Sequence, residues 1–385
     1  MIHYYFLSKV ATKVLLVTLA VTSCSRDSTK TRLKTTDFET TPSSTLDTEG
    51  TREQQDIPYA ISVSCARGAP IVATGGADGR ITVWNSLSGT ATKEIMAGAD
   101  LKDIGFSPDD RTLFSVGEYG HGIRTWDIAG GSPIWTSSSK EDGTDCSFSA
   151  CYSKDGTRMA VALCDLDLVV VDSSTGRIRT RMNGKIAGSR IRNGVEAYEI
   201  SFTPNGEQVL TPYRESEIGV WDVATGNLEA SMGEHHDTVT SVVVHPSGNG
   251  FFSVGLDELI IHWQTAENAP MQKIAGGSNG LLSFAFSSSG DVLASLSGDG
   301  TINVWGLKNG TTIEKLDVRT VAEGASEICF TADGRNILAG GWQPFLWEIR
   351  EDRKKLLGVP STDSSDRDAD GDKGPARDDG KEGDD

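Results

Sequence analysis

The sequence predicts an all-β protein in which seven similar units close into a ring. A short β-prone run that ends in tryptophan recurs along the chain, as in GRITVW, which ends at Trp84, and TINVW, which ends at Trp305. Aligned on this last position, the copies step by 42, 45, 50, 42, 42 and 42 residues, through positions 84, 126, 171, 221, 263, 305 and 347. A period in the forties with several short strands per unit is typical of β-propeller blades, since one blade cannot bury its own faces.

Each unit repeats the same order of strands and turns. In residues 281–305 (LLSFAFSSSGDVLASLSGDGTINVW) an alternating strand, a Ser/Gly turn, an apolar strand and a tight Gly-Asp-Gly turn precede the strand that ends in tryptophan. Alternation with period two between such turns is the hairpin pattern. A polar turn and a fourth strand follow, as in residues 222–232 (DVATGNLEASM). The predicted fold is therefore a seven-bladed β-propeller of four-stranded antiparallel blades, with Val171 replacing the tryptophan in the third copy.

Residues 1–23 have the features of an export signal. Lys9 and Lys13 precede an apolar run, VLLVTLAV, that is too short to cross a membrane as a helix. The following residues, VTSC, resemble the lipobox of bacterial lipoproteins, which implies that Cys24 is lipidated and becomes the mature N-terminus. A signal without lipidation, or a short anchor, is the alternative. The resemblance implies an exported protein that is lipid-anchored to the cell membrane or, because Ser25 follows the cysteine, to the outer membrane of a bacterium.

Two segments beside the predicted propeller (residues 57–360) lack the apolar side chains for a core. Residues 24–56 are rich in Thr, Ser and charge, which predicts a flexible tether. Residues 361–385 carry ten acidic and four basic groups, which predicts a disordered acidic tail. The whole chain has 54 acidic and 36 basic residues, a net charge of −18, which disfavours binding to nucleic acid. Residues 353–359 (RKKLLGV) are the candidate outer strand of the last blade.

Five cysteines remain after Cys24, at positions 65, 146, 151, 164 and 329. Export permits disulfides, but an odd number in a large domain favours small core residues over a disulfide framework. A bridge between Cys146 and Cys164 is the alternative, because the strands next to them would pair around the turn at residues 154–157. The absence of a CxxC pair disfavours zinc.

The repeats resemble those of the WD-repeat β-propeller family over residues 57–359. Trp126-Asp127 and Trp221-Asp222 carry the family's dipeptide. The resemblance implies a buried hydrogen-bonded tetrad in the fifth copy, made by four residues: His235, Ser253, Asp257 and Trp263. Such a chain would satisfy the buried indole N–H and tie a loop to the strands. The tight-turn aspartate also occurs at positions 78, 165 and 299, whereas the histidine before the first strand occurs only in the fifth copy.

The sequence favours binding over catalysis. The triplet His235-His236-Asp237, with His245 nearby, is the best candidate for a metal site or a catalytic base, but the tetrad accounts for His235. Residues 287–290 (SSSG) are a hairpin turn, and no GxSxG elbow or phosphate-binding loop occurs. We therefore expect no catalytic residue, no metal and no cofactor.

One face of the predicted ring has the features of a docking surface for other proteins. In the family, partners often contact the loops between blades and the tight turns on the same face. Residues 177–194 (RIRTRMNGKIAGSRIRNG) carry six basic groups and no acid, within a propeller of net charge −12. Arginine and aromatic residues dominate interface hot spots. The candidate partner-binding residues are Lys185, Arg190, Arg192, Tyr119, Tyr213, Arg214 and Trp342.

These features predict a monomeric, non-catalytic interaction scaffold that binds other proteins, acidic segments or glycans among them. Its lipidated N-terminus would place it on a membrane. Three alternatives stay open: a solvated loop without a binding role, a small-ligand-binding or hydrolytic propeller that uses the central channel, and an envelope-protein assembly factor that acts through blade edges.

Overall fold

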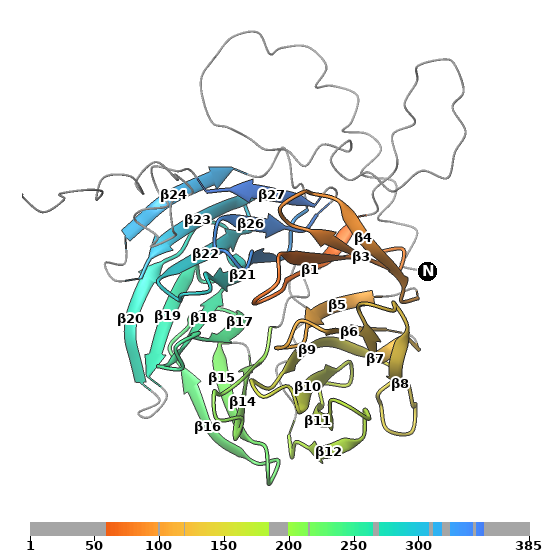
Figure 1. Ribbon diagram of the computed structural model, residues 1–385. Coiled ribbons are helices and arrows are strands. Elements are labelled where there is room, and N and C mark those ends of the chain that lie inside the picture. Colours follow the sequence, from red (N-terminus) through yellow and green to blue (C-terminus); the bar gives the residue numbers. More distant parts are fainter. Residues whose placement is uncertain are drawn as a thin grey trace, which may run out of the picture. The chain divides into compact units, whose positions relative to one another are not determined.

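The repeated strand pattern forms seven antiparallel sheets arranged as the blades of a β-propeller (Figure 1). The computed structural model describes residues 59–98, 101–118, 120–184, 199–214, 216–264, 269–307, 311–317, 324–341 and 344–349. In these residues all regular structure is β-strand, and the fold class predicted from the sequence is confirmed. The described part of the chain contains no helix long and apolar enough to span a membrane.

Each blade is a meander whose strands follow chain order from the inside of the ring to the outside. The strands of blades 1 to 4 are β1 (Ala60–Cys65), β2 (Ile71–Gly76), β3 (Arg80–Asn85), β4 (Ala91–Met96); β5 (Leu101–Phe106), β6 (Thr112–Gly117), β7 (Gly122–Asp127), β8 (Pro133–Ser137); β9 (Ser147–Tyr152), β10 (Arg158–Leu163), β11 (Leu168–Asp172), β12 (Ile178–Arg181); β13 (Ser201–Phe202), β14 (Gln208–Tyr213), β15 (Glu217–Asp222) and β16 (Leu228–Gly233).

The last three blades differ in their number of described strands. Blades 5 and 6 have four strands each, whereas the described part of blade 7 has three. The strands are β17 (Val239–Val244), β18 (Phe251–Gly255), β19 (Leu259–Gln264), β20 (Ala269–Ala275); β21 (Leu281–Phe286), β22 (Val292–Ser297), β23 (Thr301–Gly306), β24 (Thr311–Asp317); β25 (Ile328–Phe330), β26 (Asn336–Ala339) and β27 (Phe345–Glu348). The predicted outer strand at residues 353–359 lies outside the described residues, so it stays a prediction.

Burial differs between the middle and outer strands of a blade, which explains why some strands are continuous apolar runs and others alternate between apolar and polar residues. In β10 every residue after Arg158 is buried, because a middle strand is covered on both faces by neighbouring blades. In β16 only Met232 is fully buried, and exposed residues alternate with partly buried ones. A strand covered on both faces reads as a continuous apolar run, and a strand half in solvent reads as an alternation.

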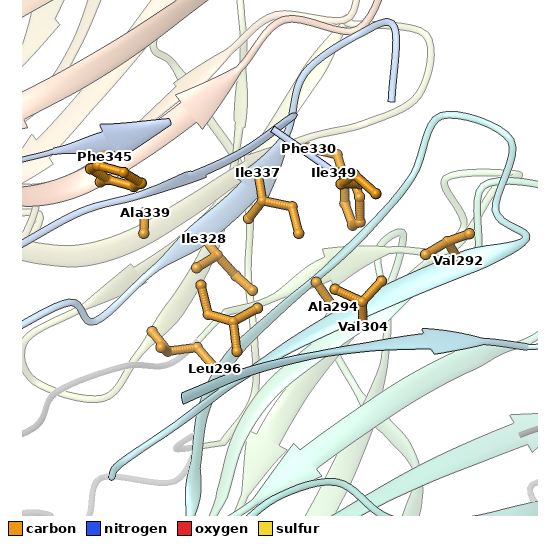
Figure 2. Packing of buried hydrophobic residues seen from close by; sticks show 11 residues of the cluster. Val292, Ala294, Leu296, Val304, Ile328, Phe330, Ile337, Ala339, Phe345 and Ile349 are labelled. Atoms are coloured by element: carbon orange, nitrogen blue, oxygen red, sulfur yellow. The ribbon is translucent and has the colours of Figure 1, made fainter. Parts of the chain in front are cut away.

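Apolar side chains fill each junction between blades. Seven buried clusters occur, one between each pair of neighbouring blades, including blades 7 and 1. Figure 2 shows the cluster between blades 6 and 7, where Val292, Ala294 and Val304 face Ile328 and Ile337. Burying each such aliphatic side chain contributes about 1.5–3 kcal/mol. The blades are therefore stabilised by stacking, as the repeat period predicts.

The ring closes where blade 7 meets blade 1 (Figure 1). Ala60 and Gly341 exchange two backbone hydrogen bonds of 2.8 Å, which join the start of β1 to the loop after β26. The Ser326 hydroxyl donates to the Ile61 carbonyl over 3.2 Å. We call this contact between β1 and blade 7 the seam.

A disulfide between Cys65 in β1 and Cys329 in β25 crosses the seam. A second disulfide joins Cys146 and Cys164, next to the paired strands β9 and β10, as the alternative reading of the sequence allowed. Only Cys151 is a free thiol among the cysteines that the structure describes. The expectation that the cysteines are core residues was therefore wrong for four of them. Cys65 and Cys329 meet because ring closure brings the ends of the repeat array together, and Cys146 and Cys164 meet because β9 and β10 pair.

Candidate functional site

The tryptophan that ends the third strand is an anchor inside its blade. In blades 1, 2, 4, 5 and 6 its indole N–H donates to a hydroxyl on the neighbouring second strand. The pairs are Trp84 with Thr74 at 3.0 Å, Trp126 with Ser115 at 2.9 Å, Trp221 with Thr211 at 2.9 Å, Trp263 with Ser253 at 2.8 Å and Trp305 with Ser295 at 2.9 Å. Each bond satisfies a buried donor that would otherwise destabilise the blade.

In blade 5 this pair extends into a chain of four side chains. The Ser253 hydroxyl lies 2.7 Å from His235 Nε2, and His235 Nδ1 lies 2.9 Å from Asp257 Oδ1. Asp257 also accepts from the backbone N–H of His236 at 2.9 Å. Burial opposes ionisation of Asp257, but the hydrogen bond and charge of His235 hold the pKa of this carboxyl below its ordinary value. The four predicted tetrad residues thus link the loop before β17 to β18 and β19.

The Asp–His–Ser order of this chain is that of a hydrolase triad, but its geometry is structural. Ser253 has no exposed surface, and its oxygen accepts the Trp263 indole N–H. A nucleophile needs an open path to a substrate carbonyl. His245 lies elsewhere, with its Nε2 2.8 Å from the Gly290 carbonyl and its Nδ1 2.7 Å from the Ser247 hydroxyl. Of the candidate catalytic histidines, His235 is therefore a buried anchor, and His245 lies apart from it in a turn.

Blade 2 has a second histidine anchor that the sequence pattern did not reveal. His121 is buried, and its Nε2 lies 3.0 Å from the Ser115 hydroxyl that accepts the Trp126 indole. This histidine comes from the tight turn before the third strand, whereas His235 precedes the first strand of its blade. A signal was present in the segment Gly120-His121-Gly122, because both glycines have positive φ values and allow the turn to fold inward.

The tight-turn aspartates organise their own turns. Asp78, Asp165 and Asp299 each accept a hydrogen bond of 3.0 Å from the backbone N–H two residues later. Asp257 accepts the corresponding bond from Leu259 at 3.3 Å. This is the Asx-turn geometry, which explains why the aspartate recurs in blades that lack a histidine.

Two of the seven candidate partner-binding residues fall in the described part of the chain. Tyr213 ends β14, and its ring packs edge-on against Trp221 with 5.7 Å between the ring centroids. The Arg214 guanidinium lies over this ring, 5.0 Å from its centroid, and 69% of the Arg214 side chain is exposed. The other candidates, Tyr119, Lys185, Arg190, Arg192 and Trp342, lie outside the described residues.

The positive charge of residues 177–194 is partly neutralised by ion pairs. Arg179 and Arg181 belong to the outer strand β12, where they pair with Asp172 and Asp167 respectively. The Arg181 pair has an N–O distance of 2.9 Å. The reversal of charge predicted for residues 177–194 is therefore weakened in its first part, because β12 pairs with β11, which has Asp167 just before it and Asp172 at its end.

A cavity of about 70 Å³ lies among the inner strands, and three acidic side chains line it. They are Asp103 in β5, Glu199 just before β13, and Glu327 just before β25. Burial raises the pKa of Asp103 to about 6, against hydrogen bonds from Ala150 and Ser62. Burial raises the pKa of Glu199 to about 7, with a further contribution from the charge of Asp103. Burial and the charge of Asp103 raise the pKa of Glu327 well above its ordinary value.

Within the described residues, no three His, Cys, Asp or Glu side chains are grouped so that they could hold a metal ion.

Comparison with known proteins gives matches to repeat proteins. The family model described as "WD domain, G-beta repeat" matches residues 226–264 and 268–306. Protein tipD of Dictyostelium discoideum is 25% identical over 197 residues, which cover 50% of this chain and 31% of that protein. Autophagy-related protein 16 of Arabidopsis thaliana is 24% identical over 254 residues, which cover 64% and 47%.

A shorter relative is matched over more of its length. Target of rapamycin complex subunit LST8 of Bos taurus is 22% identical over 267 residues, which cover 66% of this chain and 78% of that protein. The chain spans less than half the length of tipD and of autophagy-related protein 16. The described propeller, its tryptophan anchors and these matches agree: the chain carries WD40 repeats in two places and has WD-repeat proteins among its homologues.

Proposed function

We propose that this chain is a non-catalytic scaffold that binds partner proteins through the loop face of its propeller. The homologues that share its repeats support this role, and one of them is named as a subunit of a complex. Fold likeness alone does not establish function, so the proposal depends on a specific surface. The described part of that surface contains Tyr213 and Arg214, and the other candidate residues stay a prediction from the sequence.

The observation that carries the proposal is the exposed Arg214 held on the ring of Tyr213. Arg214 has φ +43°, in the left-handed region that is unfavourable for a long side chain. Its guanidinium lies over an aromatic ring that is itself braced by buried Trp221. Tyrosine and arginine are enriched in interface hot spots, so this pair has the composition of a binding hot spot.

The partner class follows from charge. The Arg214 Nη1 atom lies 3.9 Å from Glu217 Oε2, which is a long distance for an ion pair. The exposed Arg214 side chain can therefore still bind an acidic group of a partner. Lys185, Arg190 and Arg192 would add positive charge in the next loop toward blade 3. We therefore propose an acidic protein segment as the partner, with a glycan as the alternative ligand.

The test is site-specific photo-crosslinking in living cells. A photoreactive residue at position 214 should capture a defined partner, whereas one at position 111 should not. Arg111 is the matched control, because it is exposed in the turn between β5 and β6, on the opposite face of the ring. Arg214→Ala and the pair Arg190→Ala/Arg192→Ala should weaken binding of the identified partner. Equal capture from both faces, or unchanged binding, would refute the proposed surface.

We also propose export and a lipid anchor on Cys24. Two disulfides support an oxidising compartment, where such bonds persist. Metabolic labelling with a fatty-acid analogue should label the protein and not Cys24→Ser, and the variant should leave the membrane fraction. A labelled Cys24→Ser protein would refute the anchor.

The size of the axial cavity favours a scaffold over a small-ligand enzyme. At about 70 Å³ it is several times smaller than the roughly 300 Å³ at which ordinary ligand pockets begin. Its volume suits a few water molecules. The proposed partner site is therefore the loop face and not the axis of the ring.

A further inference from the structure

The three carboxyl groups of the axial cavity come from blades that are far apart in the sequence. Asp103 belongs to blade 2, Glu199 to blade 4 and Glu327 to blade 7. The inner strands of all neighbouring blades contact one another around the ring, so these side chains approach a shared space only when the ring is closed. We call Asp103, Glu199 and Glu327 the axial acids.

Each axial acid bridges its own blade to a neighbour. Asp103 accepts from the Ser62 hydroxyl of blade 1 at 3.2 Å and from the Ala150 backbone N–H of blade 3 at 3.1 Å. Its two oxygens therefore connect three consecutive blades. Both donors belong to inner strands, so this bridge joins the three blades next to the axis of the ring.

The other two acids make similar bridges. Glu199 Oε2 accepts from the Ser241 hydroxyl of blade 5 at 2.6 Å, beside a backbone bridge between the same two residues. Glu327 Oε2 accepts from the Val63 backbone N–H of blade 1 at 2.8 Å, across the seam. Four of the seven blade junctions thus depend on a carboxyl oxygen at the axis.

The charges that face these acids do not neutralise them. Lys102 lines the same cavity from β5, but its Nζ lies 3.2 Å from Glu118 Oε1. Burial raises the pKa of the nearby Cys151 thiol on β9 to about 12, so the thiol stays neutral and adds no charge. The strands β1, β17 and β21 present hydroxyl and apolar groups to the cavity. Ionisation of the axial acids would therefore place like charges in one small space.

We propose that the axial acids are a proton-controlled clasp: the ring is tight when they are protonated and loosens at the inner strands when they ionise. The bridges of Glu199 and Glu327 use only Oε2, so a proton on Oε1 keeps them and adds an O–H donor. Both oxygens of Asp103 accept, and the protonated one still has a lone pair for its donor. Ionisation removes that donor and adds repulsion across the cavity. The device regulates the rigidity of the ring, which goes beyond the proposed scaffold role.

The direction of the pH effect follows from proton linkage. The folded-state pKa values, about 6 for Asp103 and about 7 for Glu199, exceed the unfolded values of about 4. The folded chain then binds more protons than the unfolded chain between these pKa values. The contribution of these groups to the free energy of unfolding is therefore largest below about pH 4, and it is lost as the pH rises through about 6 and 7. Each such group raises the unfolding equilibrium constant up to about tenfold per pH unit in this window.

The experiment is urea unfolding of the full chain between pH 5 and pH 8.5, with Glu199→Gln, Asp103→Asn and Glu327→Gln. Glutamine keeps an acceptor for Ser241, so Glu199→Gln should fold and lose about 100-fold of the pH dependence of its unfolding equilibrium. Glu141→Gln is the control, because Glu141 is exposed in the loop after β8 and away from the axis. An unchanged pH profile in all three axial variants would overturn the proposal.

Two further outcomes are decisive. Infrared spectra at pH 6.5 should show a protonated carboxyl band in the folded wild type that weakens in each axial variant that folds, and its absence in the wild type would overturn the clasp. Millimolar Mg²⁺ or Ca²⁺ at pH 8 should leave the midpoint unchanged. If a metal ion at pH 8 restored the urea midpoint that the wild type has at pH 5, and did not do so in Glu199→Gln, the cavity would bind a cation where we propose a proton. That result would refute the proposal.

Discussion

Opening the disulfide across the seam should destabilise this protein more than opening the local one. The variants are Cys65→Ala/Cys329→Ala and, as the matched control, Cys146→Ala/Cys164→Ala. The two bonds differ chiefly in sequence separation, which is 264 residues for the first and 18 for the second. A disulfide restricts the unfolded chain, and the restriction grows with the length of the closed loop.

The loop-closure relation gives about 5.5 kcal/mol for the long loop and about 3 kcal/mol for the short one. The seam also has non-covalent contacts, which include the paired Ala60 and Gly341 amides, the Val63–Glu327 bond and the Tyr59 hydroxyl 3.0 Å from the Gly324 carbonyl. At about 1 kcal/mol each, these hydrogen bonds add up to no more than the disulfide. A buried apolar cluster also holds the seam, so the disulfide is one of several contributions to closure.

Urea unfolding followed by tryptophan fluorescence measures the difference. The seam variant should lose about 2.5 kcal/mol more than the control. Hydrogen exchange should also speed up at the Ala60 and Gly341 amides in the seam variant alone, because these amides bond across the opened junction. An equal or larger loss in the control, or unchanged exchange at the seam, would refute the view that this bond closes the ring.

Three other changes have definite expectations. Ser253→Ala should cost about 2–5 kcal/mol, measured by urea unfolding, because it leaves the Trp263 indole and the histidine of the tetrad without their shared partner; a loss below 1 kcal/mol would contradict this. Asp110→Ala should cost about 1–3 kcal/mol, since its carboxylate accepts the three backbone N–H groups of residues 67–69 in blade 1 at 2.8–3.0 Å, and Asp110→Asn should keep part of that stability. Arg214→Ala should change the free energy of unfolding by less than about 0.5 kcal/mol while it weakens partner binding, and a large loss of stability would point to a structural role.

The blades could be predicted because their determinants are local. The strand that ends at Trp305, the Asp299 turn before it and the alternation of residues 281–286 all lie within one unit. The tetrad of blade 5 was visible for the same reason, since His235 and Trp263 lie 28 residues apart in one copy. The repeat period can be recognised within the chain whether or not the two ends of the array are in contact.

The second histidine anchor was missed because its donor comes from a different turn. The pattern places a histidine before the first strand, and blade 2 has none there. His121 reaches the Ser115–Trp126 pair from the tight turn between the second and third strands of its blade, at the same end of the blade. Different loops can satisfy one buried hydroxyl, so a search for the residue type at a fixed spacing finds only one of the solutions.

The period predicts a ring, but it does not encode the contacts that close the ring. Nearest-neighbour packing is the same for an open array and for a ring, because each blade contacts only the blades beside it. What distinguishes the two is contact between ends, here Cys65 with Cys329, and side chains that meet on the axis, here Asp103, Glu199 and Glu327. In the sequence the three acids occupy the same position of their repeats, in DIGF, EISF and EICF, but only the closed ring brings them to one space. A repeated position on the inner strands that alternates between serine and an acid is therefore the first place to look for a role of the ring beyond its stability.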